Sequence, residues 1–382
     1  MRVEINKDRI KYLLALYKMS ADDLLSLLNE GRKRLLSKDV LQGDTMDVSL
    51  LKKIDAIFQK GLNFYCDFSS LKPTASSSVF FRKSQFNTEL ARESVRVVHE
   101  FETLKQTIDS YNKLSRFHIE SSVEHCTTED SPMDVAMKAR EYFFPGKISE
   151  DRAFLKALIG QCAEQGIFVF EYVETWNKKE KTNIDGFFLK PNMIVLKHQK
   201  SYKREIFTLA HELGHYMLDV EEVDQENLML MDDGEISKIE KWCNDFAYYF
   251  IMGEVAKELN VQVSHVGADT DYHYEYVAEL SKQAHISRLA IYTRLYVDGK
   301  MTFANYNTVR NELAEEYRQR QEGEKAEREN KKSFGRTPKP IISPLYLRTM
   351  QYAYFKGVVN ETDFCTRLHI KPDQFEKTIW QQ

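Results

Sequence analysis

The sequence predicts an α+β fold that is mostly helical, with one small β-sheet and helical regions on both sides of it. Apolar residues recur at helical spacing in the first 60 residues, where Ile10, Leu13, Leu14 and Tyr17 form one stripe. Residues 184–189 and 193–196 are β-rich and flank Lys190-Pro191-Asn192, which is typical of a β-hairpin. The chain then runs from this hairpin directly into an apolar helical stretch.

The first 117 residues are expected to form a series of amphipathic helices. Ser20 is a suitable N-cap for the second of them, because acidic residues follow in the first turn. Residues 50–58 form a further apolar stripe. Residues 66–80 are typical of a loop or linker, and residues 86–117 return to helical spacing.

The middle of the chain combines helices with short β-rich segments. A polar stretch ends in Ser131-Pro132, which indicates a boundary. Helices are expected at 136–144 and 154–162, followed by a strand at 167–170.

The last third is predicted to be helical. Residues 311–331 mix Glu, Arg, Gln and Lys, which favours a solvated helix or spacer. Gly335 and several prolines then break the chain, and residues 345–380 are typical of a small helical unit.

Composition excludes some functional classes. The chain has 382 residues, enough for two to three domains of about 100–200 residues each. Hydrophobic residues make up 42% and charged residues 29%, an ordinary balance for a soluble globular protein. The net charge of −4 gives no global basic excess, so any contact with DNA would depend on a local patch.

The cysteines and the N-terminus favour a cytoplasmic location. The five cysteines are scattered and form no CxxC pair, which suits a reducing compartment: Cys66, Cys126, Cys162, Cys243 and Cys365. The first residues mix charged and apolar side chains, unlike a signal peptide. No run of ~18 apolar residues predicts a membrane span, so no membrane partner is expected.

The stretch 207–218 contains a pattern that carries chemistry, His211-Glu212-Leu213-Gly214-His215. Spacing of four places both histidines on one helix face, one turn apart, so both imidazoles can reach one Zn²⁺ ion. Glu212 lies beside them and can act as the general base on a water molecule that the metal activates. It can then pass the proton to a leaving amine. The pattern predicts a zinc peptidase site.

Two histidines leave zinc one protein ligand short. The acidic residues downstream are the candidates: Asp219, Glu221, Glu222, Asp224, Asp232, Asp233, Glu235 and Glu240. Glu240 is favoured because it opens an amphipathic helix, and a rigid helix holds a ligand better than a loop does.

Residues 134–300 resemble the ImmA/IrrE family of metallopeptidases. Residues 204–215 closely match its signature, and Glu240 with residues 243–247 is similar to its second signature. The resemblance implies a zincin-like metallopeptidase domain with Glu240 as the third zinc ligand. One departure is visible, because the family's usual Met-Pro pair is here Met252-Gly253.

The family includes long members with an N-terminal helix-turn-helix domain of the phage-repressor type, and residues 1–60 resemble a degraded version. The basic stretch 31–38 stands where a reading helix would be expected, but it shows no clear second turn. DNA binding therefore remains open, with a structural helical domain favoured.

The expected organisation has five parts. Residues 1–65 form the degenerate helix-turn-helix-like domain, and 66–130 a linker and helix. Residues 131–305 form the ImmA/IrrE-like zinc peptidase domain, 306–340 a charged helical spacer and 341–382 a C-terminal helical unit.

Three further residues are candidates for stabilising an oxyanion: His273, Tyr274 and Arg294. An aromatic packing face is the favoured interpretation of the tyrosine-rich segment around residue 274. The helix-turn-helix-like segment 278–295 is expected to close the peptidase domain by packing. The remaining histidines lack ligand spacing and are expected to be ordinary: His99, His118, His125, His198, His265, His285 and His369.

The leading hypothesis is a zinc-dependent endopeptidase whose substrate is a specific protein, a repressor or antitoxin-like regulator, as the resemblance implies. The alternative is a DNA- or protein-binding regulator that keeps the zinc fold with conditional or little proteolysis. Such a regulator would act in a stress response, mobile element, toxin–antitoxin pair or phage defence. A third hypothesis is a toxin or defence factor whose protease acts only when triggered. The sequence leaves the oligomeric state open.

Overall fold

The computed structural model describes residues 1–17, 19–30, 32, 34–69, 90–174, 180–221, 223–225, 238–330 and 339–380; for 223–225 and 324–330 it describes the backbone alone. The chain divides into two compact units. The N-terminal unit comprises Met1–Glu102 with Glu180–Thr182, and the larger unit comprises Thr103–Lys179 with Asn183–Gln382. Helix α6 (Arg92–Ser115) contains the division.

The N-terminal unit is mainly helical, as predicted. Ser20 caps α2 through a reciprocal capping box with Asp23, and the apolar stripes of the helices are buried. Two three-residue strands, which the sequence did not suggest, pair in antiparallel fashion. The elements are β1 (Arg2–Glu4), α1 (Lys7–Leu16), α2 (Ala21–Asn29), η1 (Lys38–Leu41), β2 (Thr45–Asp47), α3 (Val48–Phe58) and α4 (Leu62–Cys66).

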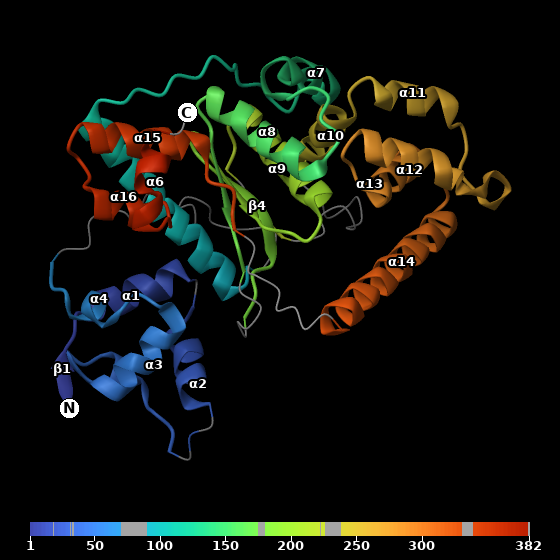
Figure 1. The fold of residues 1–382 in the computed structure, drawn as a ribbon. Coiled ribbons are helices and arrows are strands. Elements are labelled where there is room, and N and C mark those ends of the chain that lie inside the picture. The colour runs from blue at the N-terminus through green and yellow to red at the C-terminus, as the bar shows by residue number, and fades with distance from the viewer. Residues whose placement is uncertain are drawn as a thin grey trace. The chain divides into compact units, whose positions relative to one another are not determined.

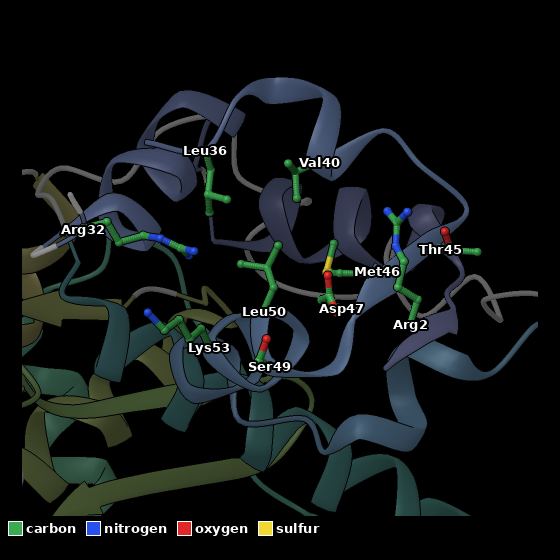
Figure 2. Close-up of a pocket in the computed structure, with 10 residues that line it drawn as sticks. All are labelled: Arg2, Arg32, Leu36, Val40, Thr45, Met46, Asp47, Ser49, Leu50 and Lys53. Atoms are coloured by element: carbon green, nitrogen blue, oxygen red, sulfur yellow. The ribbon is translucent and has the colours of Figure 1, made fainter. Parts of the chain in front are cut away.

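The basic stretch 31–38 contains no α-helix among its described residues, and only the short 3₁₀ helix η1 begins at its end. A reading helix is therefore not seen there. A pocket of about 230 Å³ lies in this region of the N-terminal unit. Figure 2 shows Arg32 and Lys53 on one side of it and Arg2 on the other.

The larger unit contains the rest of the fold (Figure 1). Its first half comprises α7 (Pro132–Phe143), α8 (Asp151–Glu164), β3 (Phe168–Tyr172), β4 (Ile184–Leu189), β5 (Met193–Lys197), α9 (Tyr202–Leu218), β6 (Val223–Gln225) and α10 (Lys238–Met252). Its second half comprises α11 (Val255–Gln262), η4 (Ala268–His273), α12 (Tyr274–Gln283), α13 (Arg288–Val297), α14 (Phe303–Asn330), α15 (Pro344–Phe355), α16 (Glu361–Arg367), η5 (Pro372–Gln374) and α17 (Phe375–Ile379).

A four-stranded sheet lies at the centre of the larger unit, in the order β3-β5-β4-β6. Strands β4 and β5 form the predicted antiparallel hairpin, with Phe187 opposite Val195. Strand β3 pairs with β5 in parallel, and β6 pairs with β4 in antiparallel fashion. Every residue of β5 is buried, which is typical of a strand covered on both faces.

Helix α9 occupies the middle of this unit. It packs against β4 and β5 of the sheet and against α8 and α10, while α10 also packs against α7. One apolar core contains side chains from α7 to α14, including those of α12 and α13. Segment 278–295 therefore packs into the same core as α9, as expected.

Several further expectations on the fold are met. The five-part division of the chain stays a prediction, and residues 70–89 and 331–338 of the expected linker, helix and spacer lie outside the described residues. The chain has the mostly helical α+β fold that the sequence predicts. Most described side chains of α14 after Leu313 are exposed, so this part is a solvated helix. The tail forms the expected helical unit from α15 to α17. Within the described residues, no helix is long and apolar enough to cross a membrane.

Candidate metal centre

Helix α9 presents the two histidines from a buried position. Leu209, Leu213 and Met217 form its apolar face, and all three are buried in the core. The helix ends at Asp219, whose φ of 50° is left-handed. Because α9 is covered by the sheet on one side and by helices on others, the positions of His211 and His215 are fixed by packing.

The structure brings His211, His215 and Glu240 together. The two Nε2 atoms lie 3.1 Å apart. Glu240 Oε2 lies 3.2 Å from His211 Nε2, and Glu240 Oε1 lies 3.4 Å from His215 Nε2. Glu240 lies in the first turn of α10, so the favoured third ligand comes from the predicted helix.

These distances fit a tetrahedral metal ion. Ligand bonds of about 2.0–2.1 Å place the corners of a tetrahedron about 3.3 Å apart. The separation of the two Nε2 atoms is close to this value, and so is the separation of each Nε2 from one oxygen of Glu240, Oε2 for His211 and Oε1 for His215. The donor set of two imidazoles and one carboxylate is one that zinc accepts in catalytic sites. Burial also fits, because the exposed fractions are 6% for His211, 0% for His215 and 1% for Glu240.

Asn244 orients one of the ligands, a role that sequence reasoning missed. Its Oδ1 lies 3.0 Å from Nδ1 of His211, so Nδ1–H can donate there and leave Nε2 for a metal. The signal was present in the sequence, since Asn244 follows Glu240 by four residues and shares its helix face.

Glu212 is buried on α9, with 1% of its surface exposed. Gly186 of β4 lies next to the carboxylate of Glu212. A Cβ atom at Gly186 would lie 3.1 Å from Glu212 Oε1 and 2.7 Å from Cγ2 of Thr208. The absence of a side chain at Gly186 therefore lets β4 approach the candidate base, which the hairpin pattern alone did not reveal.

Gly214 permits the close approach that the sequence suggested. A Cβ atom there would lie 3.2 Å from both Cα and Sγ of Cys243. Cys243 is fully buried, as expected, and lies on α10 next to Asn244. The contact holds the two ligand-bearing helices together.

The other candidates for the third ligand take different positions. Asp219 forms an ion pair with the side chain of Lys190, and Glu221 accepts from the backbone N–H of Lys190. The side chains of the remaining candidates lie outside the described residues: Glu222, Asp224, Asp232, Asp233 and Glu235.

Arg294 of α13 contacts α10 through Asp245, the residue that follows Asn244. It forms an ion pair with Asp245 of α10 and another with Asp298, and it donates to the hydroxyl of Tyr249. Burial raises the pKa of Asp245, and the nearby guanidinium opposes that rise. These contacts tie α13 to α10, and a role on an oxyanion stays a prediction.

His273 and Tyr274 lie at the junction of η4 and α12. His273 Nε2 lies 3.1 Å from the carbonyl oxygen of His265, and the hydroxyl of Tyr274 donates to Glu312 of α14. His273 does not belong to the group of donor atoms that His211, His215 and Glu240 form. Their proposed role in catalysis stays a prediction.

Residues 162–296 match the family model described as Peptidase_M78, IrrE N-terminal-like domain. The match runs from the end of α8 to α13 and contains His211, Glu212, His215 and Glu240. It covers less than half of the chain, supports the ImmA/IrrE resemblance and indicates a peptidase. The mostly helical α+β architecture is consistent with a zincin-like domain of this family flanked by helical regions. No curated protein matched the chain.

Proposed function

We propose that this protein is a zinc-dependent endopeptidase that cleaves a specific protein. One observation carries the proposal: the Nε2 atoms of His211 and His215 converge with the carboxylate of Glu240. The buried Glu212 lies next to His211 on α9. A site that only stabilised the fold would not need Glu212, whereas a hydrolytic site needs a base at that position.

Each residue has a defined task in this proposal. Bound zinc would supply Lewis-acid activation of a water molecule and polarisation of the scissile carbonyl. His211, His215 and Glu240 would hold the ion, and Asn244 would keep Nε2 of His211 available to it. Glu212 takes the proton from the attacking water and delivers it to the leaving amine.

The substrate is proposed to be a transcriptional regulator or an antitoxin-like partner. The family match over residues 162–296 supports this choice through the ImmA/IrrE resemblance. We also propose that the protein acts in the cytoplasm, since all five cysteines are free thiols and the reducing cytosol maintains that state.

The variant Glu212→Gln tests the peptidase proposal. The amide cannot accept the proton, so cleavage should be lost while zinc stays bound. Purified protein and variant are incubated with zinc in a lysate of source cells that lack the protein, and new protein N-termini are identified by mass spectrometry. Glu254→Gln is the matched control, because Glu254 is exposed, pairs with Lys257 and lies outside the group of metal-ligand candidates. If Glu212→Gln produced the same new termini as the unaltered protein, the proposal would fail.

The third ligand has its own test in the same preparations. Glu240→Ala should lower the zinc content and the cleavage together, because it removes one of the three converging donors. An unchanged zinc content in this variant would assign the third ligand to another residue.

Conditional proteolysis is the second candidate, and the burial of the site favours it. None of the four site residues exposes more than 6% of its surface. A peptide would need a rearrangement to reach Glu212, as in a regulator or defence factor that acts only when triggered. New N-termini that appear only in lysate from stressed or phage-infected cells would favour this candidate over constitutive cleavage.

Contact with DNA is a weaker part of the proposal and rests on the N-terminal unit. Its pocket is lined by three basic side chains, Arg2, Arg32 and Lys53, and one acidic side chain, Asp47 (Figure 2). Basic groups contact phosphates, and such binding weakens steeply as salt increases. A fluorescence-anisotropy titration with duplex DNA at two salt concentrations tests it, and no binding at low salt would remove DNA from the proposal.

A further inference from the structure

A second group of metal-ligating side chains lies in the larger unit, away from the centre described above. Glu171 lies on β3, His198 directly follows β5, and Glu205 lies in the first turn of α9. One donor atom of each lies within 4.8 Å of the others. The two glutamates are almost fully buried, with exposed fractions of 8% for Glu171 and 0% for Glu205.

Each carboxylate uses one oxygen for a backbone amide. Glu205 Oε1 accepts from the N–H of Gln199 at 2.6 Å, and Glu171 Oε2 accepts from the N–H of Ile341. The other oxygens, Glu205 Oε2 and Glu171 Oε1, are buried and accept no hydrogen bond from an amide or hydroxyl among the described residues, and a hydrogen bond between the two glutamates would need a proton on one of them. The backbone thus fixes both carboxylates and leaves one buried oxygen of each to be satisfied.

Two buried carboxylates require a positive charge or a proton. Desolvation and mutual repulsion both disfavour two neighbouring negative charges in a protein interior. Accordingly, burial raises the pKa of Glu171 to about 7, and the neighbouring Glu205 adds to that rise. His198 lies 3.1 Å from Glu205 Oε1 and offers at most one positive charge.

No described ion pair joins a lysine or arginine to the carboxylates of Glu171 and Glu205. Lys197 pairs with Glu174, with 3.7 Å between Nζ and Oε2. Arg152 lowers the pKa of His198 through its charge, which opposes the rise caused by Glu205. The positive charge that would satisfy both carboxylates is therefore not supplied by a lysine or arginine among the described contacts of this group.

We propose that Glu171, His198 and Glu205 form a second site for a divalent transition-metal ion, separate from the centre at His211. The donor set of one imidazole and two carboxylates suits Zn²⁺. Mg²⁺ and Ca²⁺ prefer sets of oxygen atoms alone, so the imidazole argues against them.

The position of this site indicates a structural role. It joins β3, the end of β5 and α9, which also carries His211 and His215. Through the Ile341 amide it also reaches the start of the C-terminal helical unit. An ion there would cross-link the sheet, the metal-ligating helix and the tail. The two groups share α9 but no residue, so this site does not depend on the proposed peptidase function.

Metal stoichiometry of the full chain tests the proposal, with Zn²⁺ alone as the probe. Metal-stripped protein is dialysed against zinc, freed of loosely bound ions, and measured by plasma mass spectrometry. We expect two equivalents in the unaltered protein, one in Glu171→Gln, one in Glu240→Ala, and close to none in the double variant. Glu174→Gln is the matched control, since Glu174 is a largely buried glutamate three residues further along that lies outside the group. It should keep two equivalents.

Different failures have different meanings. One equivalent in the unaltered protein, with none in Glu240→Ala, would overturn the second site and indicate a shared proton between the carboxyl groups. Loss in Glu171→Gln with no loss in Glu240→Ala would support the second site and contradict the centre at His211. His198→Gln guards against misfolding as the cause, because it should also lose one equivalent while circular dichroism stays unchanged.

Discussion

Asn244 shows how a single side chain can orient a candidate metal ligand. A neutral imidazole carries its proton on one nitrogen, and the acceptor beside that nitrogen determines which one it is. Asn244 Oδ1 lies 3.0 Å from Nδ1 of His211, a contact that favours the tautomer with the proton on Nδ1. Nε2 then keeps its lone pair and faces His215 and Glu240, as a ligand must.

Loss of this contact should weaken metal binding without unfolding the protein. We predict that Asn244→Ala lowers the affinity for zinc by about 10–100-fold, the usual effect of removing a partner that orients a ligand. Competition with a chelator of known affinity measures it. Asn244→Asp keeps an acceptor at the same place and should stay close to the unaltered protein. Equal affinities for the alanine variant and the unaltered protein would contradict the assigned role.

The sequence could predict which candidate ligands converge, because their pattern is local. His211, Glu212 and His215 lie within one and a half helical turns, and Glu240 opens a recognisable helix. Gly186 and His198 could not be found in this way. Gly186 matters because β4 passes over Glu212, and His198 has meaning only beside Glu171 and Glu205, which lie on other elements.

At the scale of elements, the metal centre depends on how closely α9 and α10 approach. Their contact point is Gly214 against Cys243, where a Cβ atom would meet the Cα of Cys243 at 3.2 Å. A backbone atom cannot rotate away as a side chain can. An added methyl group must therefore push the two helices apart, and with them the histidines of α9 and the glutamate of α10.

We predict that Gly214→Ala destabilises the zinc-free protein by about 1–3 kcal/mol, the usual cost of overpacking a core. Because the ligands separate, the affinity for zinc should fall as well. Urea unfolding with and without zinc measures both effects. Gly323→Ala on α14 is the matched control, since nothing lies within 4 Å of a Cβ atom there. That variant should be neutral or slightly more stable, because alanine favours a helix. A Gly214→Ala variant as stable as this control would contradict the close contact.

The end of α10 explains why the chain can depart from the Met-Pro pair of the family that it resembles. Gly253 has a left-handed φ of 55°, which proline cannot adopt. Arg140 of α7 donates to the carbonyl oxygens of Phe250 and Ile251, and its guanidinium fills the space beside Gly253. Glycine and Arg140 together thus end the helix in place of proline.

The elements differ in how far the sequence could predict them. The hairpin of β4 and β5 was predictable because its strands and turn are contiguous. The parallel pairing of β3 with β5 was not, because it joins segments that are distant in the chain. The pair β1 and β2 was missed for another reason, since three residues are too few to show alternation.

At the scale of the whole molecule, the chain consists of two compact units, and all residues of both proposed metal sites belong to the larger one. Composition and periodicity could predict the fold class, because they depend on averages over many residues. They could not predict which helices bury their apolar faces in the same core. That sharing follows from contacts such as those that place α12 and α13 in the same core as α9.

This division leads to a prediction about heat unfolding. All six proposed zinc ligands belong to the larger unit, so zinc should stabilise that unit alone. At zinc concentrations 100-fold above the dissociation constant, each site would contribute about 2.7 kcal/mol. In calorimetry the enthalpy of unfolding is roughly 0.7 kcal/mol per residue, so the larger unit gives the larger transition. We expect that transition to move upward by several degrees when zinc is added, while the smaller one stays in place.

The variants described above provide the controls for this measurement. Glu240→Ala should reduce the upward shift of the larger transition, because it removes one donor from the centre at His211. Glu254→Gln should leave the shift unchanged, since Glu254 takes no part in either group of ligands. A shift of the smaller transition with zinc would contradict the placement of the metal, because that unit contains none of the six proposed ligands.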